Sequence, residues 1–168
     1  LVANLISRKI KKQIDAGEAT VTVVDETGQH VYQPGFMYIA MGNQDPKSLR
    51  KPERRLLDDR VRLVIGKVSA IEASKAVSLA DGTSLEYDEL VLATGARILP
   101  ESIEHFEQEA HHFYSESAAL KLRHALDAFS GGKVVVGIAG MPYKCPPAPL
   151  EVALLIEAEL RERGLRDQ

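Results

Sequence analysis

The hydrophobic positions of this chain change their spacing several times, and each spacing predicts a different element. Between Leu1 and Ala16 the apolar residues recur close to the helical period, and Gly17 is a typical stop signal. The run from Ala19 to Val24 is β-branched and apolar on both faces, which predicts a buried, parallel strand. We expect an irregular stretch from Thr27 to Asn43 and a short charged helix from Lys47 to Leu57.

Short strand-like segments with tight spacing predict an antiparallel meander in the middle of the chain. They are Val61–Ile65, Lys67–Ala73, Ala76–Leu79 and Ser84–Tyr87. The pair Asp81-Gly82 is a hairpin turn signal between the last two segments.

The last part of the chain predicts helices alternating with buried strands. Apolar runs from Glu89 to Thr94 and from Lys133 to Ala139 predict buried strands, and a mostly polar connection runs from Arg97 to His112. Helical patterns span Glu116 to Phe129 and Ala148 to Arg163. This order of elements predicts an α/β fold with a parallel sheet and an inserted meander.

Composition and charge exclude several classes of function. The 168 residues are 45% hydrophobic and 27% charged, which suits one globular domain or parts of two. A net charge of -3 gives no basic footprint for nucleic acid. No window approaches the roughly 20 apolar residues of a membrane span, and no signal-peptide pattern opens the chain. A single cysteine excludes an internal disulfide and fits a reducing, cytoplasmic compartment.

The chain opens with a leucine inside a predicted helix and closes just after another helix. We therefore expect it to be part of a longer protein.

Cys145 lies at a predicted strand-to-helix turn, where it is a candidate for redox or nucleophilic chemistry. The positive end of the helix dipole and the neighbouring Lys144 favour a thiolate. The alternative is that Cys145 is a small apolar residue that fills a gap. Glu151, in the first turn of the same helix, is either a proton relay or an ordinary acidic residue at a helix start.

An acidic residue and a small-residue turn point to a dinucleotide. Asp25 ends the first predicted strand, where dinucleotide folds place the carboxylate that binds ribose. Acidic residues are common after strands, so the alternative is a solvated turn residue. In the string Tyr87-Asp88-Glu89-Leu90-Val91-Leu92-Ala93-Thr94-Gly95-Ala96, Ala93, Gly95 and Ala96 let the backbone approach phosphates, and Thr94 offers a hydroxyl.

This string, following a meander, resembles the flavoproteins of the pyridine nucleotide–disulfide oxidoreductase superfamily. The resemblance implies that Ala93, Thr94, Gly95 and Ala96 approach the pyrophosphate of FAD. It also implies that the backbone of Val68 faces the adenine. The glycine loop G-x-G-x-x-G would precede Leu1, so we expect FAD binding in the full-length protein and weak or absent binding by this chain alone. We accordingly expect this chain alone to be inactive as an enzyme.

Within the superfamily, the chain resembles sulfide:quinone oxidoreductases and flavocytochrome c sulfide dehydrogenases. The segments His30–Phe36, Phe113–Ser115 and Gly140–Glu151 carry this resemblance. It implies a partial Rossmann-like FAD-binding domain over residues 1–112, without its first strand. The start of a second dinucleotide-like domain would follow over residues 113–168.

The resemblance also implies a reaction and its site. Cys145 would lie over the flavin and oxidise sulfide with a second cysteine further on, and electrons would pass through FAD to a quinone. Gln33 and Pro34 would lie near the flavin, and Lys144 would stabilise anionic sulfur. The implied partners are sulfide and quinone. The resemblance also implies peripheral contact with the inner face of a membrane through regions absent here. Whether the protein forms a homo-oligomer stays open. No cysteine stands near Phe113–Ser115, so a covalent flavin link there is excluded.

Two other functions stay open. One is an NADH-dehydrogenase-like FAD reductase; the other is a non-catalytic flavin-binding or structural protein. The prolines of the Cys145 segment remove N–H donors that a nicotinamide nucleotide would need, which favours a thiol mechanism. His30, His111 and His112 are either proton relays near a flavin or polar surface residues, and no spacing predicts a metal site.

Overall fold

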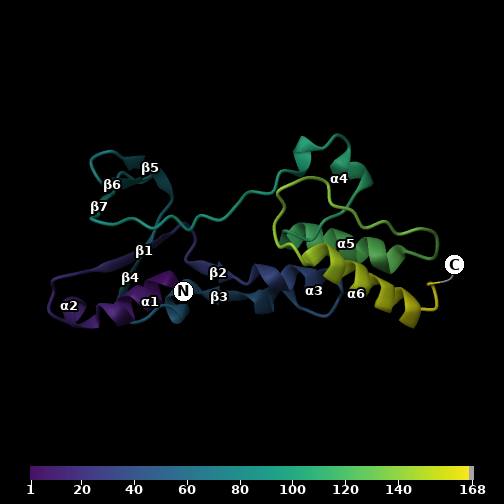
Figure 1. Ribbon diagram of the computed structural model, residues 1–168, viewed down its shortest axis with the longest axis horizontal. Helices are drawn as coiled ribbons and strands as arrows, with labels where there is room; N and C mark the ends of the chain where they lie inside the picture. Colours follow the sequence, from purple (N-terminus) through teal and green to yellow (C-terminus); the bar gives the residue numbers. More distant parts are fainter. Residues whose placement is uncertain (167–168) are drawn as a thin grey trace. The chain divides into compact units, whose positions relative to one another are not determined.

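The computed structural model describes residues 1–166, which belong to two compact units (Figure 1). Unit 1 consists of Leu1–Val31 and Arg50–Arg97. Unit 2 consists of Tyr32–Leu49 and the chain from Ile98 onward. Each unit therefore combines segments that are distant in the sequence.

The first helix and the first strand of unit 1 follow the prediction closely. Helices α1 (Val2–Lys9) and α2 (Lys11–Asp15) are separated by a break at Ile10. Gly17 follows with a φ of 75°, a conformation that costs glycine little. Strand β1 (Val21–Asp25) pairs in parallel with β4 (Val61–Ile65), with Val21 opposite Val61. The predicted parallel strand is thus confirmed, but β4 belongs to this pair and not to the meander.

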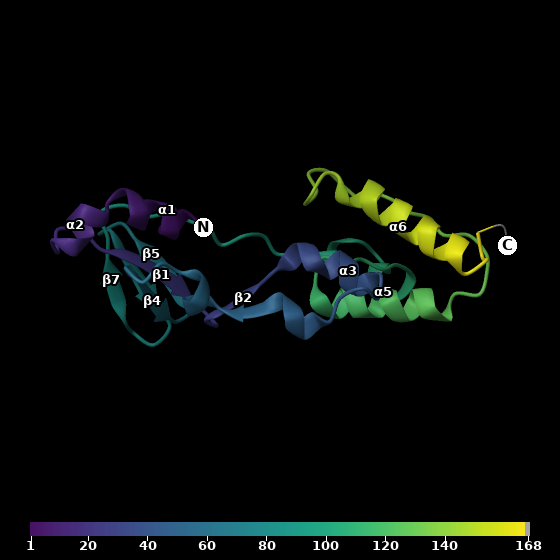
Figure 2. The same ribbon diagram turned by 90° about the horizontal axis from the view of Figure 1, so that it is seen from below.

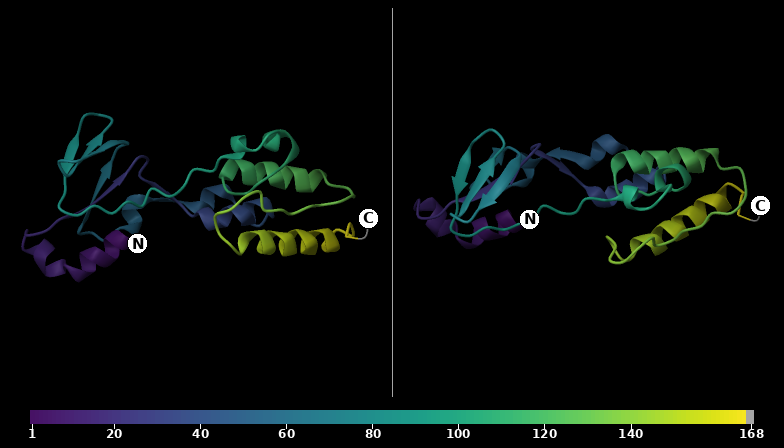
Figure 3. Two further views of the ribbon diagram at one scale, coloured as in Figure 1. Left: turned by 45° about the horizontal axis from the view of Figure 1, so that its top comes forward. Right: turned by 90° about the horizontal axis from the view of Figure 1, so that it is seen from above.

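The meander itself is a separate three-stranded antiparallel sheet (Figure 3). Strand β6 (Ala76–Leu79) is central, between β5 (Val68–Glu72) and β7 (Ser84–Glu86). The predicted turn is present, because Asp81 Oδ1 accepts a hydrogen bond of 2.9 Å from the backbone N–H of Thr83. Most of β6 is buried, whereas β5 is exposed along its length.

The predicted helix from Lys47 to Leu57 is wrong. This segment contains the short 3₁₀ helices η2 (Pro46–Leu49) and η3 (Glu53–Leu56), separated by strand β3 (Arg50–Pro52). Strand β3 pairs antiparallel with β2 (Gln29–Val31). Pro52 explains the difference, because a proline disfavours helical geometry in the preceding residue and removes a helical N–H donor.

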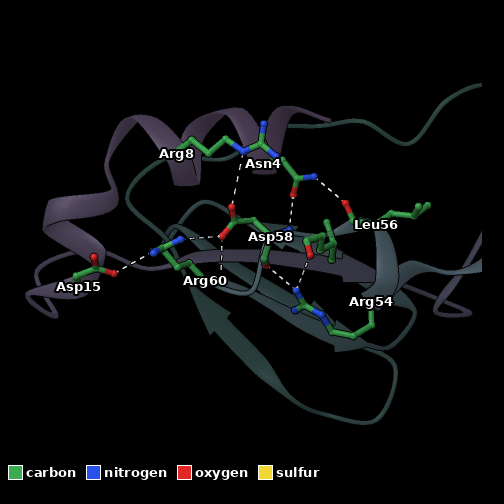
Figure 4. A network of polar contacts seen from close by, with 8 residues as sticks. Asn4, Arg8, Asp15, Arg54, Leu56, Asp58 and Arg60 are labelled. Carbon is green, nitrogen blue, oxygen red and sulfur yellow. Dashed lines mark hydrogen bonds and ion pairs between the residues drawn. The ribbon is translucent and has the colours of Figure 1, made fainter.

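A network of polar contacts connects α1 and α2 to the chain between η3 and β4 (Figure 4). Asn4 donates to the carbonyl of Leu56 over 2.7 Å, and its own carbonyl accepts from the N–H of Asp58 over 2.8 Å. Arg60 Nε donates to Asp15 over 2.9 Å. Arg54 donates to three backbone carbonyls, those of Leu57, Asp58 and Val61. Side-chain hydrogen bonds, rather than strand pairing, therefore connect α1 and α2 to the chain between η3 and β4.

Unit 2 is helical among its described residues. Its longer elements are α3 (Phe36–Ala40), α5 (Glu116–Ala128) and α6 (Ala148–Glu162). The shorter ones are η1 (Gln33–Gly35), η4 (Pro100–Ser102) and α4 (Phe106–Glu109). Helix α5 begins at Ser115, whose hydroxyl accepts from the N–H of Ala118, as is typical of an N-cap.

The core of unit 2 lies where α3 packs on α5 (Figure 2). Helix α6 buries one residue in every four, which defines a single apolar face. The buried residues of unit 2 include Phe36, Met37, Ile39, Ala40, Ala119, Leu126, Ala148, Val152, Ile156 and Leu160. The predicted helices of residues 116–129 and 148–163 are both confirmed.

Arginine side chains connect the three longer helices of unit 2. Arg123 of α5 donates to both carboxylate oxygens of Glu159 of α6, over 2.9 and 2.7 Å, and to the carbonyl of Ala40 over 3.3 Å. Arg163 donates to the carbonyls of Leu126 and Phe129 over 2.6 and 2.7 Å. Paired hydrogen bonds from a planar guanidinium fix direction as well as distance.

The two predicted buried strands from Glu89 to Thr94 and from Lys133 to Ala139 are wrong for this structure. Both segments lack regular secondary structure, and their side chains are exposed: Leu92 is 65% and Val135 80% exposed. An apolar run becomes a strand only when another strand pairs with it. Within residues 1–166 no strand pairs with either segment.

Candidate active site

Cys145 lies in unit 2, immediately before α6, and its side chain is exposed. Its φ of 60° is in the left-handed region, which costs a non-glycine residue about 1 kcal/mol or more. Its carbonyl accepts a hydrogen bond of 3.0 Å from the N–H of Ala148. The carbonyl of Cys145 thus takes up one of the free N–H groups at the start of α6. The helix that we predicted after Cys145 is present, whereas the strand predicted before it is absent.

Two of the predicted site residues meet in space although they are far apart in the sequence. The ammonium group of Lys144 donates to the side-chain carbonyl of Gln33, in η1. Pro34 follows Gln33 in the same short helix and is exposed. The structure therefore places Gln33, Pro34, Lys144 and Cys145 in one region of unit 2.

Tyrosines that the sequence did not mark as functional hold the Cys145 segment. The hydroxyl of Tyr114 donates to the carbonyl of Lys144 over 2.8 Å. The hydroxyl of Tyr143 donates to the carbonyl of Pro146 over 3.2 Å. Together these bonds fix backbone groups on both sides of the cysteine.

Tyr114 belongs to a row of ring side chains. Its ring stacks with that of Phe113, with centroids 5.0 Å apart, and lies 6.4 Å from the ring of His112. Burial raises the pKa of Tyr114, and the nearby Cys145 and Tyr143 raise it further. Burial lowers the pKa of His112, which favours the neutral imidazole in this row. Of the predicted histidines, His112 alone is placed against Tyr114 by a described contact.

Glu151, in the first turn of α6, accepts a hydrogen bond of 3.3 Å from the hydroxyl of Tyr38, in α3. The charge of Glu151 is the main cause of the raised pKa of Tyr38. This contact connects the start of α6 to α3, which gives Glu151 a structural role. The phenol of Tyr38 carried no signal in the sequence.

Asp25, the predicted ribose ligand, lies in unit 1 and organises the turn after β1. Its Oδ1 accepts hydrogen bonds from the backbone N–H groups of Thr27, over 2.9 Å, and Gly28, over 2.5 Å. The hydroxyl of Thr27 donates to the same oxygen over 3.1 Å. The structure therefore shows Asp25 ordering a turn, which was the alternative to ribose binding.

The other predicted cofactor residues of unit 1 are exposed. Val68 begins β5 opposite Leu79 and is 44% exposed. The turn Ala93–Ala96 has no regular structure, and Gly95 has a φ of 71° with open space where a side chain would stand. A small, exposed turn with a left-handed glycine fits the close approach of a phosphate group.

The comparison with known families gives the class of protein. Residues 8–141 match the pyridine nucleotide-disulphide oxidoreductase family, and the chain belongs to this family of FAD-dependent oxidoreductases.

Two curated relatives show what the chain is similar to within this family. The chain is 23% identical over 174 residues to the mitochondrial sulfide:quinone oxidoreductase of Dictyostelium discoideum, covering 99% of this chain and 37% of the relative. It is 27% identical over 151 residues to the sulfide-quinone reductase of Aquifex aeolicus, covering 87% of this chain and 34% of the relative. The chain thus spans about a third of the length of these curated relatives.

A solved structure shows the same fold. The X-ray structure of the sulfide:quinone oxidoreductase from Aquifex aeolicus matches 98% of this chain and 39% of its own, with a TM-score of 0.73 and 23% identity. The predicted α/β fold class is confirmed by this match. Among the described residues, no helix has the length and apolar character that crossing a membrane requires.

Proposed function

We propose that this chain contributes the sulfur-binding thiol of a FAD-dependent enzyme that oxidises sulfide and reduces a quinone. The observation that carries the proposal is the Cys145 segment. The only thiol of the chain is exposed, held in a left-handed conformation at the start of α6, and preceded by a lysine anchored on Gln33. Relatives named for sulfide and quinone support this choice of substrates.

The thiol would receive the sulfur atom of hydrosulfide. A new S–S bond joins Cys145 Sγ to that sulfur, one proton leaves, and two electrons are released. FAD, when bound, supplies the acceptor for these two electrons, which then reduce a quinone to a hydroquinone with two protons. The positive end of α6 and the Lys144 ammonium would stabilise the anionic sulfur.

The residues that would contact FAD are those that the resemblance assigns to it. In this proposal the small turn Ala93–Ala96 admits the pyrophosphate, with the Thr94 hydroxyl as donor. Asp25 contacts the ribose, the backbone of Val68 faces the adenine, and Gln33 and Pro34 lie near the flavin. The exposure of the turn and of Val68 supports these assignments.

The division into a FAD-binding domain over residues 1–112 and a second domain over residues 113–168 stays part of the proposal. The compact units divide the chain differently, because unit 2 includes residues 32–49 as well as the second half. A peripheral membrane location, a second cysteine and homo-oligomerisation also stay predictions.

The test is the anaerobic reduction of FAD by sulfide in the full-length protein, because we expect weak or absent FAD binding by this chain alone. The reaction is followed by loss of the visible flavin absorbance. We expect the wild-type protein to accelerate the reaction at least about tenfold over Cys145→Ser, which preserves size and polarity. Equal rates would contradict the proposal. Acceleration with NADH, but not with sulfide, would identify the NADH-dependent alternative instead.

A further inference from the structure

One contact connects the thiol segment to the helical core of unit 2 through a backbone group next to the cysteine. The Tyr114 hydroxyl donates to the carbonyl of Lys144 over 2.8 Å. That carbonyl belongs to the peptide unit that also contains the nitrogen of Cys145. Because a peptide unit is planar, fixing its carbonyl also constrains the φ of Cys145, which is 60°.

Tyr114 is itself well anchored. It immediately precedes Ser115, the N-cap of α5, and its ring stacks on Phe113 with a centroid distance of 5.0 Å. An anchored phenol can hold a strained backbone segment, because a left-handed non-glycine residue persists only where its surroundings impose it.

Tyr143, within the thiol segment, makes a different kind of contact from Tyr114. Tyr143 donates to the carbonyl of Pro146, only three residues further along the same segment. That bond shapes the segment locally but connects it to no other element. Substituting Tyr114 therefore removes a contact to another part of unit 2, whereas substituting Tyr143 removes a contact within the segment.

We infer that Tyr114 is a positioning residue for Cys145, holding the thiol segment in the one conformation from which the sulfur reaches its reaction partner. This inference rests on the proposed function. The raised pKa of Tyr114, to which the nearby Cys145 contributes after burial, supports the proximity of phenol and thiol.

The first experiment tests this proximity without any reference to sulfide. The tyrosine ionisations are followed by ultraviolet absorbance in the wild type, Cys145→Ser, Tyr114→Phe and the double variant. We expect Cys145→Ser to move one of the five tyrosines to a lower pKa, and we expect no such shift in the Tyr114→Phe background. A shift that persists without Tyr114, or no shift at all, overturns the coupling.

The second experiment separates positioning from reactivity. Iodoacetamide reacts with the single thiol of the chain and needs no particular approach, whereas the transfer of electrons from sulfide to FAD needs a defined geometry. We expect Tyr114→Phe to lower the sulfide-dependent reduction of FAD about tenfold in the full-length protein, while alkylation of this chain stays within about twofold of the wild type.

Matched controls complete the test. Tyr143→Phe removes the local bond, and we expect a loss no larger than about threefold. Tyr87→Phe, in unit 1, is expected to change neither rate. Equal losses in Tyr114→Phe and Tyr143→Phe, or a parallel loss of alkylation, would overturn the positioning role. A full-length wild type that transfers no electrons from sulfide would refute the proposed function, while the titration still decides the coupling.

Discussion

Two regions of the molecule use an arginine to join segments, but with different partners. In unit 1, the exposed Arg54 donates to the backbone carbonyls of Leu57, Asp58 and Val61 (Figure 4). In unit 2, Arg123 is 14% exposed and pairs with Glu159, which is 20% exposed. We expect the same side chain to contribute more in unit 2, because Arg123 and Glu159 form a mostly buried charge pair, whereas Arg54 is exposed and bonds neutral carbonyls.

The largest expected effect is the loss of Arg123. Arg123→Ala removes the bidentate partner of the mostly buried Glu159, leaves Arg163 as its remaining partner, and breaks the contact to Ala40. We expect the free energy of unfolding to fall by about 3 kcal/mol, the lower end for a broken buried pair, since some exposure remains. Urea unfolding measures this. Arg161→Ala, in an exposed pair with Glu157, is the matched control and is expected to cost less than about 0.5 kcal/mol.

The second effect concerns Arg54. Arg54→Ala removes the donor of three carbonyls, and we expect a loss of about 1.5 kcal/mol in the free energy of unfolding. Arg54→Lys keeps the charge without the planar fork, so most of the loss should persist. If Arg54→Ala cost as much as Arg123→Ala, burial would not explain the difference between the two regions.

The third effect concerns the start of α5. Ser115→Ala removes the acceptor for the Ala118 N–H and should cost about 1 kcal/mol, whereas Ser115→Asp should be nearly neutral. Ser117→Ala, two residues further along and exposed, is the control. It removes the 3.3 Å contact between the two serine hydroxyls but keeps the acceptor for the Ala118 N–H. A loss of equal size in Ser117→Ala would show that helix propensity, not capping, is being measured.

The smallest effect is a dependence of stability on pH. The Arg123 guanidinium lowers the pKa of Glu159 below its ordinary 4.5. A lowered carboxyl pKa adds stability that is present above the ordinary value and lost as the pH falls through the folded value. Stability should therefore decline below about pH 4.5, and Glu159→Gln should flatten part of that decline.

The backbone N–H of Arg60 likewise lowers the pKa of Asp58, in unit 1. Asp58→Asn should flatten the acid decline less than Glu159→Gln. The main partner of Asp58 is a neutral backbone N–H, whereas Glu159 accepts two charge-assisted hydrogen bonds from Arg123. Unfolding curves collected between pH 3 and pH 7 distinguish the two. The reverse order would show that the contacts of Asp58 are the stronger ones.

Several elements could be predicted from the sequence because their cause is local. The periodicity of residues 148–163 gives α6, the Asp81-Gly82 pair gives the hairpin turn, and Ser115 gives the start of α5. The helix predicted over residues 47–57 is absent. The reason, Pro52, is also local, and the prediction was wrong because it did not take this proline into account.

For the candidate site, the sequence alone supplied the candidate residues: a single cysteine after a lysine, small residues from Ala93 to Ala96, and Asp25 at a strand end. Only the tertiary structure decided that Lys144 meets Gln33, that Tyr114 holds the peptide before Cys145, and that the apolar runs at 89–94 and 133–139 are unpaired. The physical reason is that hydrogen bonds and strand pairing between distant segments depend on which backbones come close together. Side-chain pattern records which surfaces can be buried, but not which partner buries them.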